Sequence, residues 1–382
     1  MPEPATDRAP KILEIGSIPY LHEAFPQTTD FYSTWPDETL SDPARGRNIV
    51  SAANLAVLAR RLADPGYDLV AVQAAAYSPW SLRGLSRLLL RREVLRGSLP
   101  LIRAVGPQLL RGHVAAPVAV LDLDDPAVID RSNIFLLDQA AVYFKRELPA
   151  DHWQVFNGTL HWRVPTPRFR SDARHRERIG KLRPISLGIP FPVTKAALPA
   201  PLPAAGKTVD VFFAGRVQGS STVRERGLKE LLALRAEGLV VDVPESPLAM
   251  DEYLARCARA WLVWSPAGYG WQCFRTCEAA LCGSVPLVNQ PTIEQHRPLI
   301  AGEHAFYYDV EPGGLARAVR TALADRDRLM TMAAAAREHV LAWHTPQALA
   351  RYIVETTLQM AGRTGAKGGV TSHPKIPSGW ER

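Results

Sequence analysis

Short apolar runs alternate with amphipathic stretches along the first half of the chain. Runs of this kind are typical of strands that are buried on both faces of a sheet, and they occur at 11–16, 68–73, 118–123, 133–138 and, as a further candidate, 185–190. Residues 48–66, between the first two runs, have helical periodicity and end in Pro-Gly, which predicts a helix. Strands that alternate with helices in this way predict a parallel, doubly wound α/β sheet.

A Pro/Ala-rich segment separates this half from a second alternation. Residues 194–207 read TKAALPAPLPAAGK, which favours an interdomain linker because the segment offers little to bury. Strands are then predicted at 209–215, 239–243, 261–266, 285–289 and 305–309, and helices at 224–238, 249–260, 271–282, 314–344 and 348–360. We therefore expect a first domain at 1–193, a linker at 194–207, a second domain at 208–345, a closing helix at 346–360 and a disordered tail at 361–382.

Length and composition agree with two globular domains. A chain of 382 residues is too long for one ordinary core, and 47% hydrophobic residues is a globular composition. No apolar run reaches the roughly 18–20 residues that a membrane span requires. The N-terminus lacks the pattern of a signal peptide, and four cysteines are too few for a disulfide scaffold. We expect a cytoplasmic protein.

The net charge of +7 is unevenly distributed. Residues 80–111 hold seven arginines and one glutamate, with Arg83, Arg87 and Arg91 on one face of a predicted helix and leucines on another. Two interpretations stay open: an ordinary helix with a solvated arginine face, and a peripheral contact with an anionic membrane surface. Binding to nucleic acid is not expected, because the chain contains no matching recognition module.

Three of the four cysteines fall in residues 265–283, SPAGYGWQCFRTCEAALCG. A structural zinc site needs four ligands, usually in Cys-x-x-Cys pairs or with histidines nearby. Cys273 and Cys277 are four residues apart, Cys282 lies five further on, and the stretch contains no histidine. The pattern therefore predicts that the cysteines pack a helix against the sheet, and no metal is expected.

The same stretch carries a family resemblance. The strand VFFAGR, the pair Arg226-Gly227, the segment GYGWQCFRTCEAALCGSVPLVNQ and the end with WHTPQ together resemble GT-B glycosyltransferases, in particular the bacterial glycosyl transferases group 1 and a CgeB-like or exostosin-like branch. The resemblance covers about residues 207–357, and extends to the first half only through its architecture and YFKRELP at 143–149. It implies two Rossmann-like domains that face each other across a cleft. The second domain would bind a nucleotide-sugar, and the first would bind the acceptor.

The chemistry of the stretch agrees with that implication. Residues 267–270, AGYG, form a flexible loop, and a helix that opens near Trp271 would present free N–H groups to a pyrophosphate. Arg275 is placed to pair with phosphate oxygens. By the family pattern, Glu278 accepts hydrogen bonds from the ribose hydroxyls of the nucleotide-sugar. Gly283 is predicted to cap the helix C-terminus.

One position departs from the family pattern. Many retaining glycosyltransferases of this family carry another glutamate eight residues before the one that matches Glu278. This chain has Gly270 there, so we leave open whether the reaction inverts or retains configuration. The resemblance further implies that Arg216 and Arg226 contact the diphosphate, with a polar loop at 219–221 between them. The predicted nucleotide-sugar site thus comprises Arg216, Arg226, Gly270, Arg275 and Glu278.

The first half offers several candidates for a general base. An inverting transferase needs an Asp, Glu or His that removes the proton of the acceptor hydroxyl, and the candidates near strand ends are Asp122, Asp124, Asp138 and His22. Asp122-Leu123-Asp124 could also bind a divalent metal, although a strand-end turn or a carboxylate at the cleft is the preferred interpretation. In YFKRELP, the side chains of Lys145, Arg146 and Glu147 either line the cleft or belong to a salt-bridged surface helix.

The leading hypothesis is a metal-independent glycosyltransferase without a cofactor, which moves a sugar from a nucleotide-diphosphate to a glycan, lipid or protein acceptor. In it, cationic side chains stabilise the leaving diphosphate. The alternatives are a nucleotide-sugar epimerase with the same two-domain fold, and a binding protein that has lost turnover.

Overall fold

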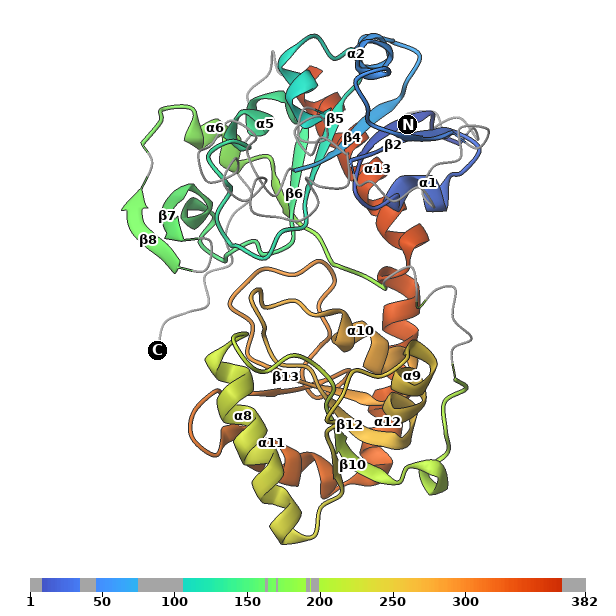
Figure 1. Ribbon diagram of the computed structural model, residues 1–382, viewed down its shortest axis with the longest axis vertical. Helices are drawn as coiled ribbons and strands as arrows, with labels where there is room; N and C mark the ends of the chain where they lie inside the picture. Colours follow the sequence, from blue (N-terminus) through green and yellow to red (C-terminus); the bar gives the residue numbers. More distant parts are fainter. Residues whose placement is uncertain are drawn as a thin grey trace.

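The computed structural model describes residues 9–34, 46–74, 106–161, 164–169, 171–189, 193 and 199–365. These residues form two parallel sheets flanked by helices, one above the other in Figure 1. The predicted architecture of two doubly wound α/β domains is confirmed. Within these ranges, no helix combines the length and the apolar character needed to cross a membrane. Arg83, Arg87 and Arg91 of the predicted basic helix lie outside the described residues.

The first domain contains a seven-stranded, all-parallel sheet with the order β3-β2-β1-β4-β5-β6-β9. Its strands are β1 (Ile12–Gly16), β2 (Thr29–Ser33), β3 (Arg47–Ile49), β4 (Leu69–Gln73), β5 (Val118–Asp122), β6 (Val142–Lys145) and β9 (Leu182–Pro184). A separate antiparallel pair consists of β7 (Asn157–His161) and β8 (Val164–Phe169). The strand order reverses direction between β1 and β4, and parallel sheets of this kind bind ligands outside the carboxyl ends of their strands.

Both faces of this sheet are covered. The helical segments are α1 (Tyr20–Ala24), α2 (Leu55–Leu62), η4 (Leu109–Arg111), α5 (Ile134–Gln139), η5 (His152–Phe156) and α6 (His175–Ile179). Leu13 and Ile15 of β1 belong to the core on one face, whereas Ile12 belongs to the core on the other. Because the side chains of a strand alternate between faces, burial on both faces explains why β4 and β5 are almost entirely apolar.

The second domain repeats this plan with five parallel strands in the order β11-β10-β12-β13-β14. The strands are β10 (Val209–Phe212), β11 (Val241–Asp242), β12 (Ala260–Trp264), β13 (Val285–Asn289) and β14 (Phe306–Tyr308). The helical segments are α8 (Thr222–Ala233), η7 (Leu234–Glu237), α9 (Met250–Arg259), α10 (Phe274–Leu281), α11 (Gly314–Leu323) and α12 (Arg326–Trp343). Two apolar cores again lie on opposite faces of the sheet.

The last helix, α13 (Pro346–Gly365), returns to the first domain. In Figure 1 it is the red helix that runs from the lower domain up to α1 and β4. Ala350, Ile353 and Val354 enter the core of the first domain, and the Tyr352 hydroxyl donates a hydrogen bond to the Pro184 carbonyl at 2.9 Å. The helix continues past the predicted end at residue 360.

Four predicted elements differ from the structure. The helix predicted at 48–66 spans only Leu55–Leu62, because Arg47–Ile49 form the strand β3. Residues 133–138 form the short helix α5 rather than a strand, because only Leu136 and Leu137 on one side of it are deeply buried and β6 takes the next place in the sheet. The run 185–190 is not a strand: β9 ends at Pro184, and the chain then leaves the sheet toward the other domain. The single helix predicted at 314–344 is two, because Asp325 caps a new helix by accepting from the Arg328 N–H.

The start of the second domain is fixed by a buried lysine at the end of the predicted linker. Lys207 Nζ donates to the carbonyls of Ala260 and Gly283 at 2.9 and 2.6 Å and to the Ser284 hydroxyl at 3.0 Å. Burial lowers its pKa to about 8. Gly283 has a φ of +73°, as expected of the glycine that caps α10.

Gly227 lets α8 approach the sheet closely. A Cβ atom at this position would lie 2.3 Å from Cζ2 of the fully buried Trp264. The Arg226-Gly227 pair noted in the sequence therefore has a packing role at its second residue.

We expect Gly227→Ala to destabilise the protein by about 1–3 kcal/mol, because overpacking outweighs the gain in helix propensity of about 1 kcal/mol. Gly362→Ala in α13 is the matched control, since a Cβ atom there meets nothing within 4 Å, and it should be neutral or stabilising. Urea unfolding measures both changes. Equal stability of the two variants would contradict this packing role.

Candidate functional site

The two domains meet through residues that follow the carboxyl ends of their strands. In the first domain, Arg146 and Glu147 come directly after β6. In the second, residues 265–272 link β12 to α10. The helix begins at Phe274 with Cys273 as its N-cap, three residues later than expected from Trp271. We call residues 265–272 the β12–α10 turn.

Glu147 binds this turn across the domain boundary. Its two carboxylate oxygens accept hydrogen bonds from the backbone N–H groups of Trp271 and Gln272 at 2.7 and 2.9 Å. Glu147 is only 3% exposed. Burial raises the pKa of this carboxyl, while Arg146 and the two N–H groups act in the opposite direction. Lys145 ends the buried strand β6, so the alternative of a salt-bridged surface helix is wrong, and Arg146 and Glu147 lie at the contact between the two domains.

Gln272 and Arg146 complete this contact. The Gln272 side-chain amide donates to the carbonyls of Arg146 and Ile185 at 2.6 and 3.0 Å, and its oxygen accepts from the Leu187 N–H at 3.0 Å. Arg146 donates to the Gln272 carbonyl at 2.7 Å and pairs with Asp125 at 2.8 Å. Sequence reasoning did not select Gln272, because a single glutamine in a loop carries no recognisable signal.

Arg275 braces the end of β10 rather than pointing freely into the cleft. Its Nε and Nη2 atoms donate to the Ala214 carbonyl at 3.0 and 2.5 Å, and its guanidinium lies over the Phe213 ring. The side chain is 7% exposed. Its Nε and Nη2 atoms thus hold the strand end, and pairing of Arg275 with phosphate stays a prediction.

Glu278 lies one turn further along the same face of α10. One carboxylate oxygen, Oε2, accepts a hydrogen bond from the Tyr253 hydroxyl of α9 at 2.7 Å. Burial raises the pKa of Glu278, and the bond from Tyr253 acts against that increase. Among the residues that the structure describes, no hydrogen bond reaches its Oε1 atom, which leaves an acceptor for a ligand hydroxyl.

The side chains of the three arginines that follow β10, Arg216, Arg224 and Arg226, have different surroundings. Arg216 is exposed and makes no ion pair within the described chain. Arg226, predicted to contact the diphosphate, instead lines a shallow hollow with Tyr308 and Glu311 on another side of α8. Residues two apart on a helix point in different directions, and Arg224 is the one that reaches the β12–α10 turn, where it donates to the Pro266 carbonyl at 3.3 Å.

Arg224 was missed in the sequence because Arg226 stands before the glycine that the family pattern marks. It also donates to the Arg216 carbonyl at 2.9 Å. Its Nε atom is buried and has no hydrogen-bond partner among the described residues. Asp125 of the first domain is close enough to raise the Arg224 pKa against the dominant effect of burial, which lowers it.

Asp122 and Asp124 at the end of β5 have different roles. Asp122 is buried and accepts from Lys145 Nζ at 3.1 Å and from the Tyr143 hydroxyl at 2.8 Å, so it is occupied by structural partners. Burial and the neighbouring Asp122 charge raise the pKa of Asp124 to about 7. No ion pair engages Asp124 within the described chain. Of the two, Asp124 has the properties of an acid or base that works near neutral pH.

The other two base candidates are engaged by other groups or buried. Asp138 is on α5 rather than at a strand end, and pairs with Arg178 and Arg174 at 2.6 and 3.2 Å; its bond to Arg178 lowers its pKa. His22 is in α1 and 1% exposed, with Nδ1 2.9 Å from the Thr29 carbonyl. A catalytic base must reach the acceptor, and neither position allows this.

The cysteines behave mainly as packing residues. Cys257 and Cys282 are fully buried in the core on one face of the second sheet, and Cys277 packs against it. Burial raises the pKa of Cys277 to about 12. Cys273 differs, because its sulfur accepts from Arg275 Nη1 at 3.5 Å. In the described ranges, no group of three or more His, Cys, Asp or Glu side chains is arranged to hold a metal ion.

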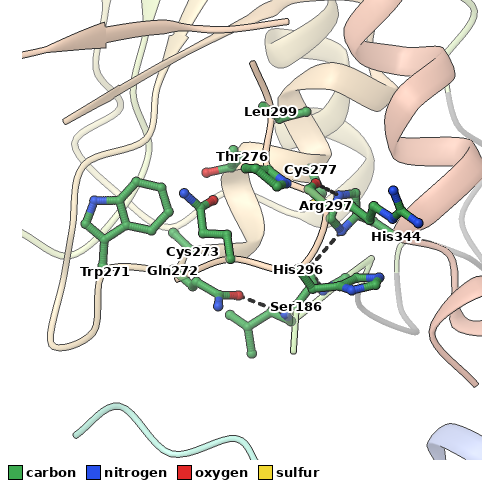
Figure 2. A pocket seen from close by; sticks show the side chains of 14 residues that line it. Ser186, Trp271, Gln272, Cys273, Thr276, Cys277, His296, Arg297, Leu299 and His344 are labelled. Carbon is green, nitrogen blue, oxygen red and sulfur yellow. Dashed lines mark hydrogen bonds between the residues drawn. The ribbon is translucent and has the colours of Figure 1, made fainter. Parts of the chain in front are cut away.

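A pocket opens on the face of α10 opposite to Arg275 and Glu278, close to the segments that connect the two domains. Figure 2 shows Thr276 and Cys277 of α10 on one wall, with Ser186, His296 and His344 nearby. Arg275 and Glu278 do not line it, because they occupy the other face of the helix. The predicted nucleotide-sugar site is therefore separate from this pocket.

We compared the chain with known protein families and proteins. Residues 225–355 match the family model described as glycosyl transferase-like. No curated protein sequence matches the chain significantly. The second domain is thus glycosyl transferase-like over most of its length, as the resemblance implied.

Solved structures share the whole architecture. Sucrose-phosphate synthase from Thermosynechococcus elongatus is 13% identical, with a TM-score of 0.52 and coverage of 92% of this chain and 100% of that chain. The N-terminal domain of Candida albicans trehalose-6-phosphate phosphatase is 12% identical, with a TM-score of 0.54 and coverage of 93% and 97%. An alpha-glucosyltransferase in complex with UDP and DNA is 10% identical, with a TM-score of 0.52 and coverage of 92% and 100%. The chain has the GT-B fold, and the family match together with this fold supports a transferase.

The raised pKa of Asp124 predicts a pH-dependent cost to stability. Between about pH 4 and 7 the unfolded chain loses a proton that the folded protein keeps, so stability falls as pH rises through this window. Asp124→Asn removes the cost, and its stability relative to wild type should increase by roughly 1–2 kcal/mol between pH 5 and pH 8.

Urea unfolding at the two pH values measures this difference. Asp138→Asn is the control: the pKa of Asp138 is lowered, so its contribution is lost only below about pH 4 and should be constant from pH 5 to 8. A relative stability of Asp124→Asn that is the same at both pH values would contradict the raised pKa.

Proposed function

We propose that the protein transfers a sugar from a nucleotide-diphosphate to an acceptor bound in the cleft between its two domains. The observation that carries the proposal is the arrangement around β10 and α10 of the glycosyl transferase-like domain. The groups there are Glu278 of α10, whose Oε1 atom is free, and Arg216 and Arg224, which follow β10 and have donor groups without a partner among the described residues. A carboxylate can accept hydrogen bonds from ribose hydroxyls, and arginine side chains can donate hydrogen bonds to the oxygens of a diphosphate.

Glu278 is the proposed ribose contact. Tyr253 holds Oε2, so the carboxylate is oriented before a ligand arrives, and Oε1 is left to accept from a sugar hydroxyl. A ligand without a hydroxyl would leave the Glu278 Oε1 atom removed from water and without a hydrogen bond, which is unfavourable. This position therefore selects for a ligand that carries a hydroxyl group.

Arg216 and Arg224 are the proposed diphosphate contacts. Arg216 is exposed beside the end of β10, and the buried Nε atom of Arg224 lacks a partner among the described residues. Arg275 supports them by fixing the Ala214 carbonyl from which this strand end turns. Cations held in this way stabilise a leaving diphosphate without a metal ion, which is the basis for proposing a metal-independent reaction.

Asp124 is the proposed general base. It follows β5 at the same edge of the first sheet as Arg146 and Glu147, and burial brings its pKa to about 7. A base with that pKa accepts a proton from an acceptor hydroxyl efficiently at neutral pH. An acceptor on the first domain, whether glycan, lipid or protein, remains a prediction, as do placement in the CgeB-like branch, a cytoplasmic location and membrane contact through residues 80–111.

We expect a nucleoside diphosphate to raise the melting temperature of the full chain. UDP is the first probe, because one structural neighbour was solved with UDP, and GDP and dTDP complete the set. A ligand at 100 times its Kd stabilises a protein by about 2.7 kcal/mol. Arg216→Ala should weaken binding about tenfold. Arg226 is also exposed but lies on another side of α8, so Arg226→Ala should have little effect.

The absence of any shift with all three nucleotides would refute the proposed function. Binding without release of nucleotide from any nucleotide-sugar and acceptor mixture would instead favour a binding protein of the same fold.

We also expect Asp124→Asn to lower kcat by about 10²–10⁴ while the KM for the nucleotide-sugar stays unchanged, because general bases contribute factors of this size. Steady-state kinetics measures both constants. Asp138→Asn should have kcat near wild type, since Asp138 pairs with Arg178. A similar kcat for both variants would remove Asp124 from the mechanism.

A further inference from the structure

The family resemblance implied an acid at position 270, where this chain has glycine, and the structure shows what occupies the space beside it. A Cβ atom at position 270 would lie 2.6 Å from Oε1 and 2.7 Å from Cδ of Glu147, and 3.2 Å from Nη2 of Arg146. No side chain larger than hydrogen fits there while Glu147 is in place. The carboxylate beside the β12–α10 turn thus comes from the opposite domain.

We propose that Glu147 is a positioning residue for the nucleotide-sugar site: from the first domain it holds the β12–α10 turn of the second domain in its binding conformation. This inference rests on the proposed function. The Glu147 carboxylate fills the space beside Gly270 from the opposite domain, so the nucleotide-sugar site would be complete only when the two domains are in contact.

The hydrogen bonds between Glu147 and the β12–α10 turn are strong enough to hold the turn in place. Each Glu147 oxygen accepts one backbone N–H, from Trp271 and from Gln272, and hydrogen bonds to a charged acceptor are about twice as strong as neutral ones. Arg146 Nε lies 3.3 Å from Oε1, which offsets the charge. The two N–H groups lie just before the N-cap of α10, so no helical carbonyl can satisfy them.

The turn that Glu147 holds is connected to the groups proposed to bind the diphosphate. The Ser221 hydroxyl donates to the Ala267 carbonyl at 2.7 Å, and Arg224 donates to the Pro266 carbonyl. The Tyr269 hydroxyl donates to the Gly219 carbonyl at 3.0 Å. A shift of the turn would therefore displace the loop between β10 and α8, which carries Arg216.

Other contacts at the same boundary do not touch the turn. The Glu294 N–H donates to the Leu148 carbonyl at 2.7 Å, and its side chain pairs with His152 at 3.1 Å. Glu294 is thus an acid of the same interface that joins the domains without holding residues 265–272. It supplies a matched control that separates closure of the interface from positioning of the turn.

The test uses the full chain and, as probe, whichever of UDP, GDP and dTDP stabilises the wild type most. Calorimetry measures the Kd of that nucleotide, and thermal unfolding measures the melting temperature without it. Glu147→Gln keeps the size but replaces one acceptor oxygen by an NH₂ group that faces a backbone N–H. We expect it to weaken nucleotide binding about tenfold or more and to lower the melting temperature as well, because a buried acceptor is lost. Glu294→Gln should bind the nucleotide as the wild type does.

A second pair of variants tests the geometry itself. Gly270→Ala should weaken nucleotide binding in the wild-type background, because its methyl group displaces the Glu147 carboxylate. In a Glu147→Ala background the space is open, so adding Gly270→Ala should cause no further loss, a non-additivity expected of residues in contact.

The outcomes are distinguishable. Wild-type binding together with a Kd of Glu147→Gln within twofold of wild type overturns the positioning role alone, even if the melting temperature falls, because Glu147 would then be only a strut between domains. Additive losses for Gly270→Ala and Glu147→Ala overturn it as well. A wild-type protein that binds none of the three nucleotides overturns the proposed function, and this inference with it.

Discussion

The position of the two domains depends on one buried carboxylate that bridges them. Glu147 is almost completely removed from water, and an ionised group in that situation is stable only when its oxygens are paired. The pairing groups are two backbone N–H groups of the other domain, held to 2.7 and 2.9 Å. Hydrogen bonds weaken steeply when they lengthen or bend, so the end of β6 and the β12–α10 turn must keep their separation closely.

The connections between the domains reinforce the same arrangement. His344, at the end of α12, has Nδ1 2.9 Å from the Ser186 hydroxyl and Nε2 3.0 Å from the Arg297 carbonyl. Burial lowers the His344 pKa to about 3, so the imidazole stays neutral across the physiological range. Beyond it, α13 buries its apolar face in the first domain. The chain therefore crosses between domains at two places that are packed and hydrogen-bonded next to each other.

The fold was predictable where burial is symmetrical. Strands such as β5 and β13 are covered on both faces, so nearly every residue is apolar and the run is visible in the sequence. The same signal failed at 133–138, because a short helix packed on a sheet and a buried strand have similar composition over six residues. It also missed β3, whose three residues are only half-buried. The break between α11 and α12 was missed because a single aspartate cap is a weak signal inside a long helical pattern.

The sequence by itself determined which residues share the face of α10, since Arg275 and Glu278 are three apart on a helix of known period. It also determined that position 270 lacks an acid. The partners of these residues were decided only by tertiary structure: Arg275 holds the Ala214 carbonyl, and Glu278 is held by Tyr253. The choice of Arg224 over Arg226 depends on where α8 begins and how Gly227 sets it against Trp264. Glu147 reaches Gly270 because two sheets formed from distant parts of the chain meet at their strand ends, a contact that local periodicity does not encode.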